Sequence, residues 1–398
     1  TGGTMITWIR RNLFRSITDS ILTVVSASIL GFVVLQVFQF VFITGRWEII
    51  QVNLKILLVG RFPEDMMFLV GFSILATCFS IASLASGVSR TVETTPRLAG
   101  RLWELFQRFG LIIATSAFLI VLAGDLDAIL FGAYVLLAIL GGRLFGRARR
   151  NTSLRKLPGW LWVTMNATLP LVLIFLTMGQ AALEEWGGFL INFYLAVVSI
   201  ALSFPLGVLL ALGRRSTLPL LRWLCTAYIE LLRGAPLFVL LLLAGVALEF
   251  FIPASIAPDA IFRAVTVFTL FTAAYLAEVI RGGLQSIPKG QAEAGKALGL
   301  STFKITFLIT LPQALRNVIP AQIGQFISLF KDTTLAGVAL SVFDLLNVGT
   351  AITKQDDYLG QGLIYESLAF VGLLFWVGSY VMSRESQRIE KKLGVGIR

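Results

Sequence analysis

The chain has 398 residues, of which 57% are hydrophobic and only 14% are charged. Soluble globular domains carry about 45–50% apolar and about 25% charged residues, so this composition excludes a water-soluble fold. Lys and Arg outnumber Asp and Glu by 33 to 22, which gives a formal net charge of +11. In a membrane protein this excess reflects the retention of Lys and Arg in cytoplasmic loops. We therefore expect the lipid bilayer, and no nucleic acid, as a partner.

The sequence contains no histidine. This excludes His-based zinc sites, haem ligation through imidazole and nucleophilic triads that use imidazole as the base. Cys78 and Cys225 stand alone in apolar surroundings, so they predict neither a disulfide framework nor a CxxC metal site. We therefore expect no catalytic residue and no metal site in this chain.

Charge-poor apolar segments of about 20 residues are expected to cross the bilayer, and the sequence has ten candidates. They are residues 19–43, 67–87, 110–124, 127–146, 160–178, 188–213, 232–252, 260–281, 317–345 and 362–383. The third and fourth are separated only by residues 124–127, which predicts a tight helical hairpin. The predicted fold is all-α, a polytopic helical membrane protein with about ten transmembrane helices. Residues before Met5 are set aside, and no cleavable signal peptide is expected because the first segment is long enough to span.

The distribution of basic residues tests this topology. With the amino terminus inside, the predicted cytoplasmic segments hold 27 of the 33 Lys and Arg, and these segments are 1–18, 88–109, 143–159, 214–234, 281–316 and 384–398. The sequence therefore predicts that both termini are cytoplasmic. The longest outer segment, residues 44–66, is predicted to form an interfacial, amphipathic turn, with contact to an external partner as the alternative.

The cytoplasmic segment 281–316 carries the most informative motifs. From Gly290 to Lys296 it reads G-x-x-x-x-G-K, but Ala297 replaces the magnesium-ligating Ser or Thr and no strand precedes it, so the match is interpreted as accidental. A run of small residues between Pro288 and Pro312 predicts a short helix that can approach another protein closely. The alternative is a solvated connector between two spans.

The spacing inside this segment matches a known pattern: EAA, three residues, Gly, nine residues, Ile-x-Leu-Pro. The matching residues are Glu293, Ala294, Gly295, Gly299, Ile309, Leu311 and Pro312. They resemble the EAA loop of binding-protein-dependent ABC importer permeases, with Gly295 in place of the second Ala as the one departure. Residues 230–237, which read E-L-L-R-G-A-P-L, are similar to a segment of the polar amino acid permease family. Residues 8–14 and 59–63 look like the longer permeases of general L-amino acid importers.

This resemblance implies a type I ABC importer permease core at 186–398, preceded by a membrane extension of about five helices at 5–185. The coupling loop is 282–316, with Glu293, Ala294, Gly295, Lys296, Gly299 and Leu300 as the residues that contact the ATPase.

The implied partners are two cytoplasmic ATPase subunits, which hold ATP and magnesium, a second and non-identical permease subunit, and a periplasmic or extracellular amino acid binding protein. This chain would bind no cofactor and would not itself be an enzyme. It would lie in the bacterial plasma (inner) membrane and carry acidic or neutral polar amino acids.

A second candidate site lies inside the ninth apolar segment, at Lys331, Asp332, Thr333 and Thr334. Charges inside a membrane are costly and usually face a cavity or a partner. Asp332 or Thr333 can cap a helix that starts near Leu335, which predicts a broken span. Opposite charges beside a broken helix suit a zwitterionic substrate. The alternative is an ion pair and cap that only hold two half-helices together.

Two i,i+3 pairs flank the loops of the predicted core, Glu230 with Arg233 and Glu278 with Arg281. Each pair either stabilises a helix end or forms part of a gate or subunit interface.

Ser199, Ser203 and Gly207 predict close helix packing. The alternative function is an ion-coupled secondary amino acid transporter that acts alone, but the sequence has few intramembrane carboxylates for an ion relay.

Overall fold

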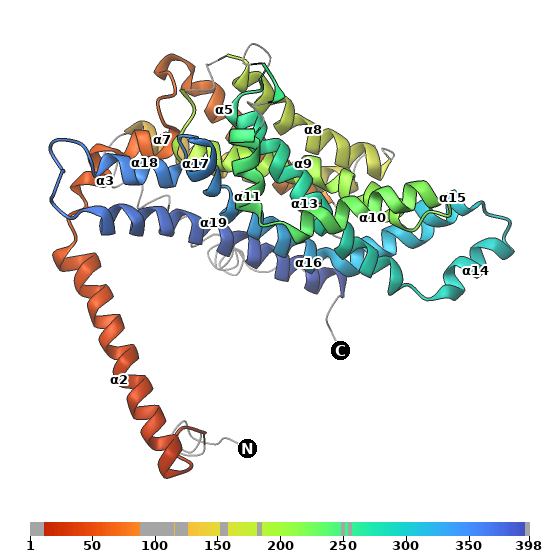
Figure 1. Cartoon of the computed structure of the whole chain (residues 1–398), viewed down its shortest axis with the longest axis horizontal. Coiled ribbons are helices and arrows are strands. Elements are labelled where there is room, and N and C mark those ends of the chain that lie inside the picture. Colours follow the sequence, from red (N-terminus) through yellow and green to blue (C-terminus); the bar gives the residue numbers. More distant parts are fainter. Residues whose placement is uncertain are drawn as a thin grey trace. The chain divides into compact units, whose positions relative to one another are not determined.

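The computed structural model describes residues 12–87, 115, 126–151, 158–180, 185–247, 251–253 and 257–394. The chain divides into two compact units, Thr1–Ile49 and Ile50–Arg398. Across the described ranges the secondary structure is helical, and β pairing is limited to two isolated bridges (Figure 1). The predicted all-α fold class is confirmed.

The first unit contains α2 (Ile17–Gln39), which continues as the π-helix η1 (Phe40–Thr44). Ser16 precedes α2, and its Oγ accepts a hydrogen bond from the backbone N–H of Asp19 at 3.1 Å, which satisfies one of the free donors of the first turn. The helix is apolar on all sides, as expected for a helix that faces lipid. It corresponds to the predicted span 19–43.

From residue 48 onward the described residues form a series of helices. In chain order they are α3 (Glu48–Val52), α4 (Leu54–Val59), η2 (Glu64–Met66), α5 (Met67–Gly87), α7 (Leu126–Asn151), α8 (Gly159–Met178), α9 (Gly188–Arg214), α10 (Pro219–Gly234), α11 (Leu237–Leu242), η5 (Leu243–Ala247), α13 (Ala260–Gln285), α14 (Lys289–Ala297), α15 (Thr302–Lys304), η6 (Ile305–Thr310), α16 (Leu311–Asp332), α17 (Leu335–Leu340), α18 (Leu345–Ile352) and α19 (Ile364–Leu393).

Five helices among the described residues are long and apolar enough to cross a membrane, and a sixth is counted if the bent pair α10 and α11 is one span. The five are Ile17–Thr44, Glu64–Leu84, Gly188–Arg214, Ala260–Gln285 and Ile364–Glu390. The predicted number of about ten is therefore not confirmed. The predicted span 110–124 lies, apart from Thr115, outside the described residues. Helices do occupy 126–151, 159–178 and 311–332, close to three further predictions.

The boundaries of the predicted span 232–252 are wrong. Pro219–Gly234 and the helix that starts at Leu237 meet at an angle of 102°. The bend follows from Pro236, which lacks an N–H and disfavours helical backbone at the preceding residue, where Ala235 has φ −96° and ψ 140°. α10 is thus an amphipathic helix that a sharp bend separates from α11.

Small residues bring α9 and α13 close together, as the sequence predicted. A Cβ atom added at Gly207 would lie 2.8 Å from the Cβ of Leu276 and 3.2 Å from the carbonyl oxygen of Ala273. Ser199 and Ser203 of the same helix are fully buried. The backbones can approach because no side chain separates them.

Residues 54–62 are buried more deeply than the predicted interfacial turn. Leu57 and Phe62 have almost no exposed surface, and the backbone of Gly60 forms an isolated bridge with Trp186. Further along, the Ser73 and Tyr194 hydroxyls are hydrogen-bonded, which links α5 to α9. These contacts join residues 57–73 to the start of α9 within the second compact unit.

Gly207→Ala is expected to lower the thermal midpoint of the purified protein, since overpacking a helix contact costs about 1–3 kcal/mol. The matched control is Gly324→Ala in α16, where an added Cβ meets nothing within 4 Å. This change is expected to be neutral or to stabilise by up to about 1 kcal/mol, because Ala favours helix over Gly. Equal midpoints for the two variants would contradict the packing described here.

Candidate functional site

The predicted coupling segment contains a short helix, α14, that ends in a glycine-dependent cap. The N–H of Leu300 donates to the carbonyl of Gly295 at 3.1 Å, and the N–H of Gly299 donates to the carbonyl of Lys296 at 2.9 Å. Gly299 has φ +73°, so these bonds form a Schellman motif that favours glycine at this position. The G-x-x-x-x-G-K run lies within this helix rather than in a phosphate-binding loop, in agreement with its interpretation as accidental.

Gly295 is the buried residue on which α14 packs. An added Cβ would lie 2.9 Å from Cγ1 of Ile305 and 3.3 Å from Cδ1 of Ile309, both in η6. The departure from the EAA pattern therefore fits the packing, since Ala at this position would require the side chain of Ile305 to move. The contact holds α14 firmly against the helix that continues into α16.

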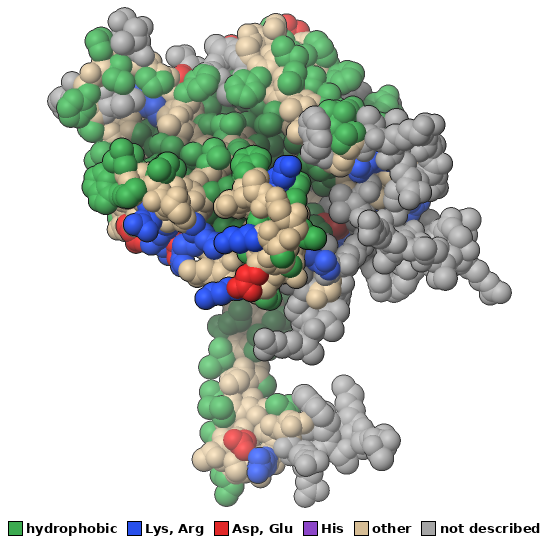
Figure 2. All heavy atoms as spheres, turned by 90° about the vertical axis from the view of Figure 1, so that its right-hand side faces the viewer, with side chains coloured by type: hydrophobic (Ala, Val, Ile, Leu, Met, Phe, Trp, Pro, Cys, Tyr) green, Lys and Arg blue, Asp and Glu red, His purple; other side chains and the backbone are tan. Residues whose placement is uncertain are grey.

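The opposite side of α14 is exposed and carries both charged and apolar groups. Glu293, Ala294 and Lys296 are exposed, and Leu298, just beyond the helix, is 79% exposed. Leu300 is half-buried at the end of the cap. Figure 2 looks at the end of the second unit that holds α14 and α15, and it shows blue Lys and Arg side chains gathered beneath a largely hydrophobic surface.

Polar contacts join the α14 region to α16. Asn317 Nδ2 donates to Ser286 Oγ at 3.2 Å, and Gln313 Nε2 donates to Gln291 Oε1 at 3.5 Å. α16 is a single helix of 22 residues, which is about 33 Å long at the usual rise per residue. One continuous element therefore connects the coupling segment to Lys331 near its far end.

The chain breaks between α16, which ends at Asp332, and α17, which begins at Leu335. The predicted break is confirmed, but the predicted cap is wrong, because Thr334 occupies the cap position and makes no capping bond to α17. The hydroxyls of Thr333 and Thr334 instead donate back to the carbonyls of Phe330 and Lys331, at 2.8 and 2.9 Å. These bonds satisfy the last turn of α16 rather than the first turn of α17.

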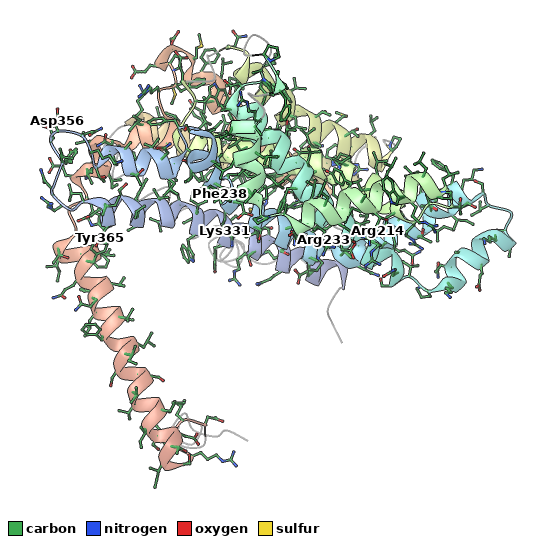
Figure 3. The ribbon with its side chains drawn as sticks, viewed as in Figure 1. Arg214, Arg233, Phe238, Lys331, Asp356 and Tyr365 are labelled. Carbon is green, nitrogen blue, oxygen red and sulfur yellow. The ribbon has the colours of Figure 1, made fainter. Side chains whose placement is uncertain are left out.

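Lys331 is exposed on the surface of this chain, whereas Thr333 is fully buried. Figure 3 places Lys331 between Asp356, which lies at one end of the second unit, and Arg233 and Arg214, which lie toward the end that holds α14. No ion pair joins Lys331 to Asp332 among the described side chains. The lysine therefore lies partway along the helices with an exposed side chain, and its charge acts on the neighbouring Asp332 carboxylate without a direct ion pair.

Thr333 is held by Asn192, a residue that the sequence reasoning missed. Asn192 lies in the second turn of α9 and is fully buried. Its Nδ2 donates to Thr333 Oγ1 at 3.0 Å and to Asp344 Oδ2 at 3.3 Å, and its Oδ1 accepts from the N–H of Leu345 at 2.9 Å. The signal in the sequence was a lone amide inside an otherwise apolar span.

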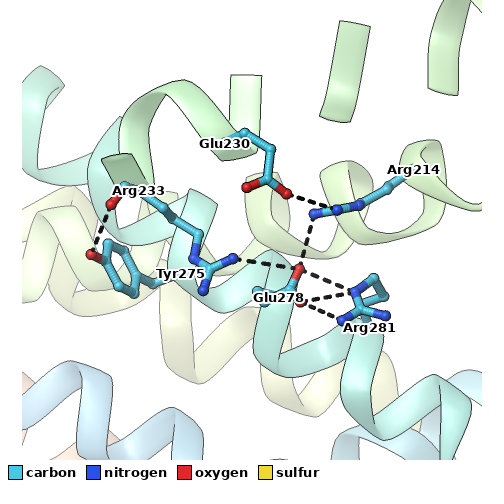
Figure 4. A network of polar contacts seen from close by, with 6 residues as sticks. All are labelled: Arg214, Glu230, Arg233, Tyr275, Glu278 and Arg281. Atoms are coloured by element: carbon cyan, nitrogen blue, oxygen red, sulfur yellow. Dashed lines mark hydrogen bonds and ion pairs between the residues drawn. The ribbon is translucent and has the colours of Figure 1, made fainter. Parts of the chain in front are cut away.

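The two predicted i,i+3 pairs meet in one network centred on Glu278 (Figure 4). Arg281 pairs with Glu278 through both its Nε and its Nη2, with the Nε bonds at 3.0 and 3.1 Å. Arg214, at the end of α9, contacts Glu278 at 3.0 Å and Glu230 at 2.8 Å. Arg233 approaches Glu278 to 3.8 Å. The network thus joins the carboxyl-terminal ends of α9, α10 and α13.

Arg233 also lies over the ring of Tyr275, 5.5 Å from its centroid. Sequence spacing predicted a Glu230–Arg233 pair, but each residue has a partner on another helix instead. Arg214 was not predicted, although a basic residue in the last turn of a span is a common helix-end feature. Metal-ligand geometry is not found here, since the described residues contain no group of three or more Cys, Asp or Glu suited to a metal ion.

The long apolar helices are those of a membrane protein, and comparisons with known proteins identify its family. The family model described as "Binding-protein-dependent transport system inner membrane component" matches residues 203–395. The probable glutamine ABC transporter permease protein GlnP of Bacillus subtilis is 35% identical over 205 residues, which cover 52% of this chain and 91% of GlnP.

The glutamate/glutamine/aspartate/asparagine transport system permease protein BztC of Rhodobacter capsulatus is 42% identical over 229 residues, or 58% of this chain. The chain spans about half of BztC, 51% of its length. A solved structure of an amino acid ABC transporter is 26% identical, covers 52% of this chain and 92% of the solved chain, and has a TM-score of 0.46.

The chain belongs to the family of binding-protein-dependent transport system inner membrane components. The resemblance to amino acid ABC transporter permeases that the sequence motifs predicted is confirmed. The family and the apolar helices make the chain an integral inner-membrane protein.

Glu278→Gln is expected to lower the thermal midpoint by about 3 °C or more, because about 1 kcal/mol shifts the midpoint of a domain of this size by about 2–4 °C. The neutral amide leaves Arg214, Arg233 and Arg281 close together without their shared carboxylate. The matched control is Glu385→Gln in α19, where the carboxylate pairs with Arg388 of the same helix. A midpoint loss no larger than that of the control would show that the network does not hold the three helices together.

Proposed function

We propose that this chain is a permease subunit of an ATP-driven ABC importer that moves amino acids into the cytoplasm. The names of its relatives, which include transport systems for glutamate, glutamine, aspartate and asparagine, favour acidic and neutral polar amino acids as substrates. In this proposal two ATPase subunits hold ATP and magnesium, a second permease completes the path, and a binding protein delivers the substrate. The basic loops support an orientation with both termini in the cytoplasm.

The observation that carries the proposal is the connection from the exposed helix α14 to the exposed Lys331 through one continuous helix, α16. Glu293, Ala294 and Lys296 form the exposed face of α14, and Leu298 adds an apolar group beside them. A partner subunit that docks on this face moves η6 through Gly295, and α16 continues directly from η6. We therefore assign Glu293, Ala294, Gly295, Lys296, Gly299 and Leu300 to ATPase coupling.

We assign the amino acid path to the segment around the break between α16 and α17. Lys331 offers a positive charge to the substrate carboxylate, and Asp332 offers a negative charge to its ammonium group. Thr334 adds a hydroxyl, whereas the buried Thr333 anchors the segment to α9. The network of Glu230, Arg233, Glu278 and Arg281 lies toward the α14 end, where it suits a gate that closes when the three helix ends meet.

Reconstitution tests this function and the role of Glu293. The complex captured through a tag on this chain is expected to contain an ATPase and to import labelled glutamate, glutamine, aspartate or asparagine into proteoliposomes only when ATP is hydrolysed. Glu293→Arg is expected to reduce the recovered ATPase at least about tenfold, as for the loss of a central interface residue. Glu390→Arg reverses a charge in α19, outside the docking face, and serves as the matched control.

Two results would contradict the proposal. One is uptake by this chain alone under an ion gradient without ATP, which would support a secondary transporter. The other is full recovery of the ATPase with Glu293→Arg, which would remove α14 from the coupling interface.

Lys331→Ala is expected to reduce uptake about tenfold or more at an unchanged amount of complex, because a hydrogen bond to a charged group contributes about 1.5–3 kcal/mol. Lys354→Ala removes the same charge from an exposed loop position and is expected to leave uptake unchanged. Uptake by Lys331→Ala at the level of this control would exclude Lys331 from the substrate path.

A further inference from the structure

The break beside Lys331 is fixed to α9 by a buried amide. Asn192 donates both of its N–H groups and accepts one bond at its carbonyl oxygen, so both of its donors are committed. Its three partners belong to two separate places in the chain, the break at Thr333 and the start of α18 at Asp344 and Leu345. A single side chain of α9 therefore sets the position of the break relative to the next helix.

Asp344 extends this connection. It is fully buried, and its Oδ1 accepts the N–H of Asn347 at 2.9 Å, which caps α18, while Oδ2 faces Asn192. A Cβ added at Gly337 of α17 would collide with Oδ1. The first turn of α9 adds a backbone bond, from the N–H of Gly188 to the carbonyl of Phe343 at 2.9 Å. α9, α17 and α18 thus meet around one carboxylate and one amide.

We infer that Asn192 is a positioning residue of the amino acid path, which holds the segment containing Lys331 in the place where it meets the substrate. This inference rests on the proposed function. The short connection supports it, since Thr333 is two residues from Lys331 and its hydroxyl bonds both to Asn192 and to the carbonyl of Phe330. A shift of the amide moves the end of α16 directly, because no flexible segment lies between them.

The chemistry of the amide suggests a specific perturbation. In Asn192→Asp the new carboxylate still accepts from Leu345, but it loses both donors and faces the carboxylate of Asp344. The exchange Asn192→Asp with Asp344→Asn restores a donor and an acceptor between positions 192 and 344, but it does not restore the N–H that Asn192 donates to Thr333. Thr333→Val keeps the side-chain volume and removes only the hydroxyl, so it cuts the bonds to Asn192 and to the carbonyl of Phe330 without adding a charge.

The experiment measures ATP-driven uptake of labelled glutamate, glutamine, aspartate and asparagine, per assembled complex, in proteoliposomes containing the complete transporter. Thr333→Val is expected to lower uptake about tenfold, Asn192→Asp is expected to lower it further because it also sets two carboxylates against each other, and the exchanged pair is expected to return uptake to the level of Thr333→Val. Asn166→Asp is the matched control, because Asn166 is also buried but, among the described residues, bonds only to Trp162 of its own helix. It is expected to reduce the amount of complex without reducing uptake per complex.

Combination with Lys331→Ala separates positioning from a general structural role. If Asn192 acts through Lys331, Asn192→Asp lowers uptake no further once Lys331 is Ala, whereas independent effects multiply. Three results would each overturn the inference while leaving the proposed path in place. The first is that the effects of Asn192→Asp and Lys331→Ala multiply. The second is unchanged uptake in both Asn192→Asp and Thr333→Val, and the third is an exchanged pair as defective as Asn192→Asp. Unchanged uptake in Lys331→Ala alone would instead overturn the proposed path itself.

Discussion

The free-energy cost of an unpaired charge in an apolar environment governs where this chain keeps its ionisable groups. At the helix ends near α14, the carboxylates of Glu278 and Glu230 pair with Arg214, Arg233 and Arg281, so charges from three helices partly offset one another. The buried Asp344 is satisfied by N–H groups of Asn192 and Asn347. Lys331 makes no ion pair or hydrogen bond with its side chain among the described residues, and its exposed charge, partway along the helices, interacts with the neighbouring Asp332 carboxylate.

Close packing at three glycines holds neighbouring helices of the second unit against one another. Gly207 brings α9 against α13, Gly283 brings α13 against α16, and Gly295 seats α14 on η6. Interiors packed at this density transmit displacement rather than absorb it. A movement imposed on α14 can therefore reach both the Glu278 network through α13 and the break after Asp332 through α16.

Sequence reasoning located the features that depend on local composition. Continuous apolar runs gave α2, α5, α9, α13 and α19, and the adjacent charges at Lys331 and Asp332 marked the break. It failed where the outcome depends on partners far away in the chain. Arg214 lies 64 residues from Glu278, and Asn192 lies 152 residues from Asp344, so no spacing rule connects either pair. The start of the predicted seventh span was also missed, because Pro236 bends the chain between α10 and α11.

By itself, the sequence determined the membrane environment, the helical class and the family, because these follow from hydropathy, from the location of basic residues and from a motif of fixed spacing. Only the tertiary structure decided which charges pair, why Gly295 replaces Ala, and how Thr333 is used. The physical reason is that ion pairs, close approach and burial depend on distances between helices, and those distances exist only once α9, α13 and α16 have packed together.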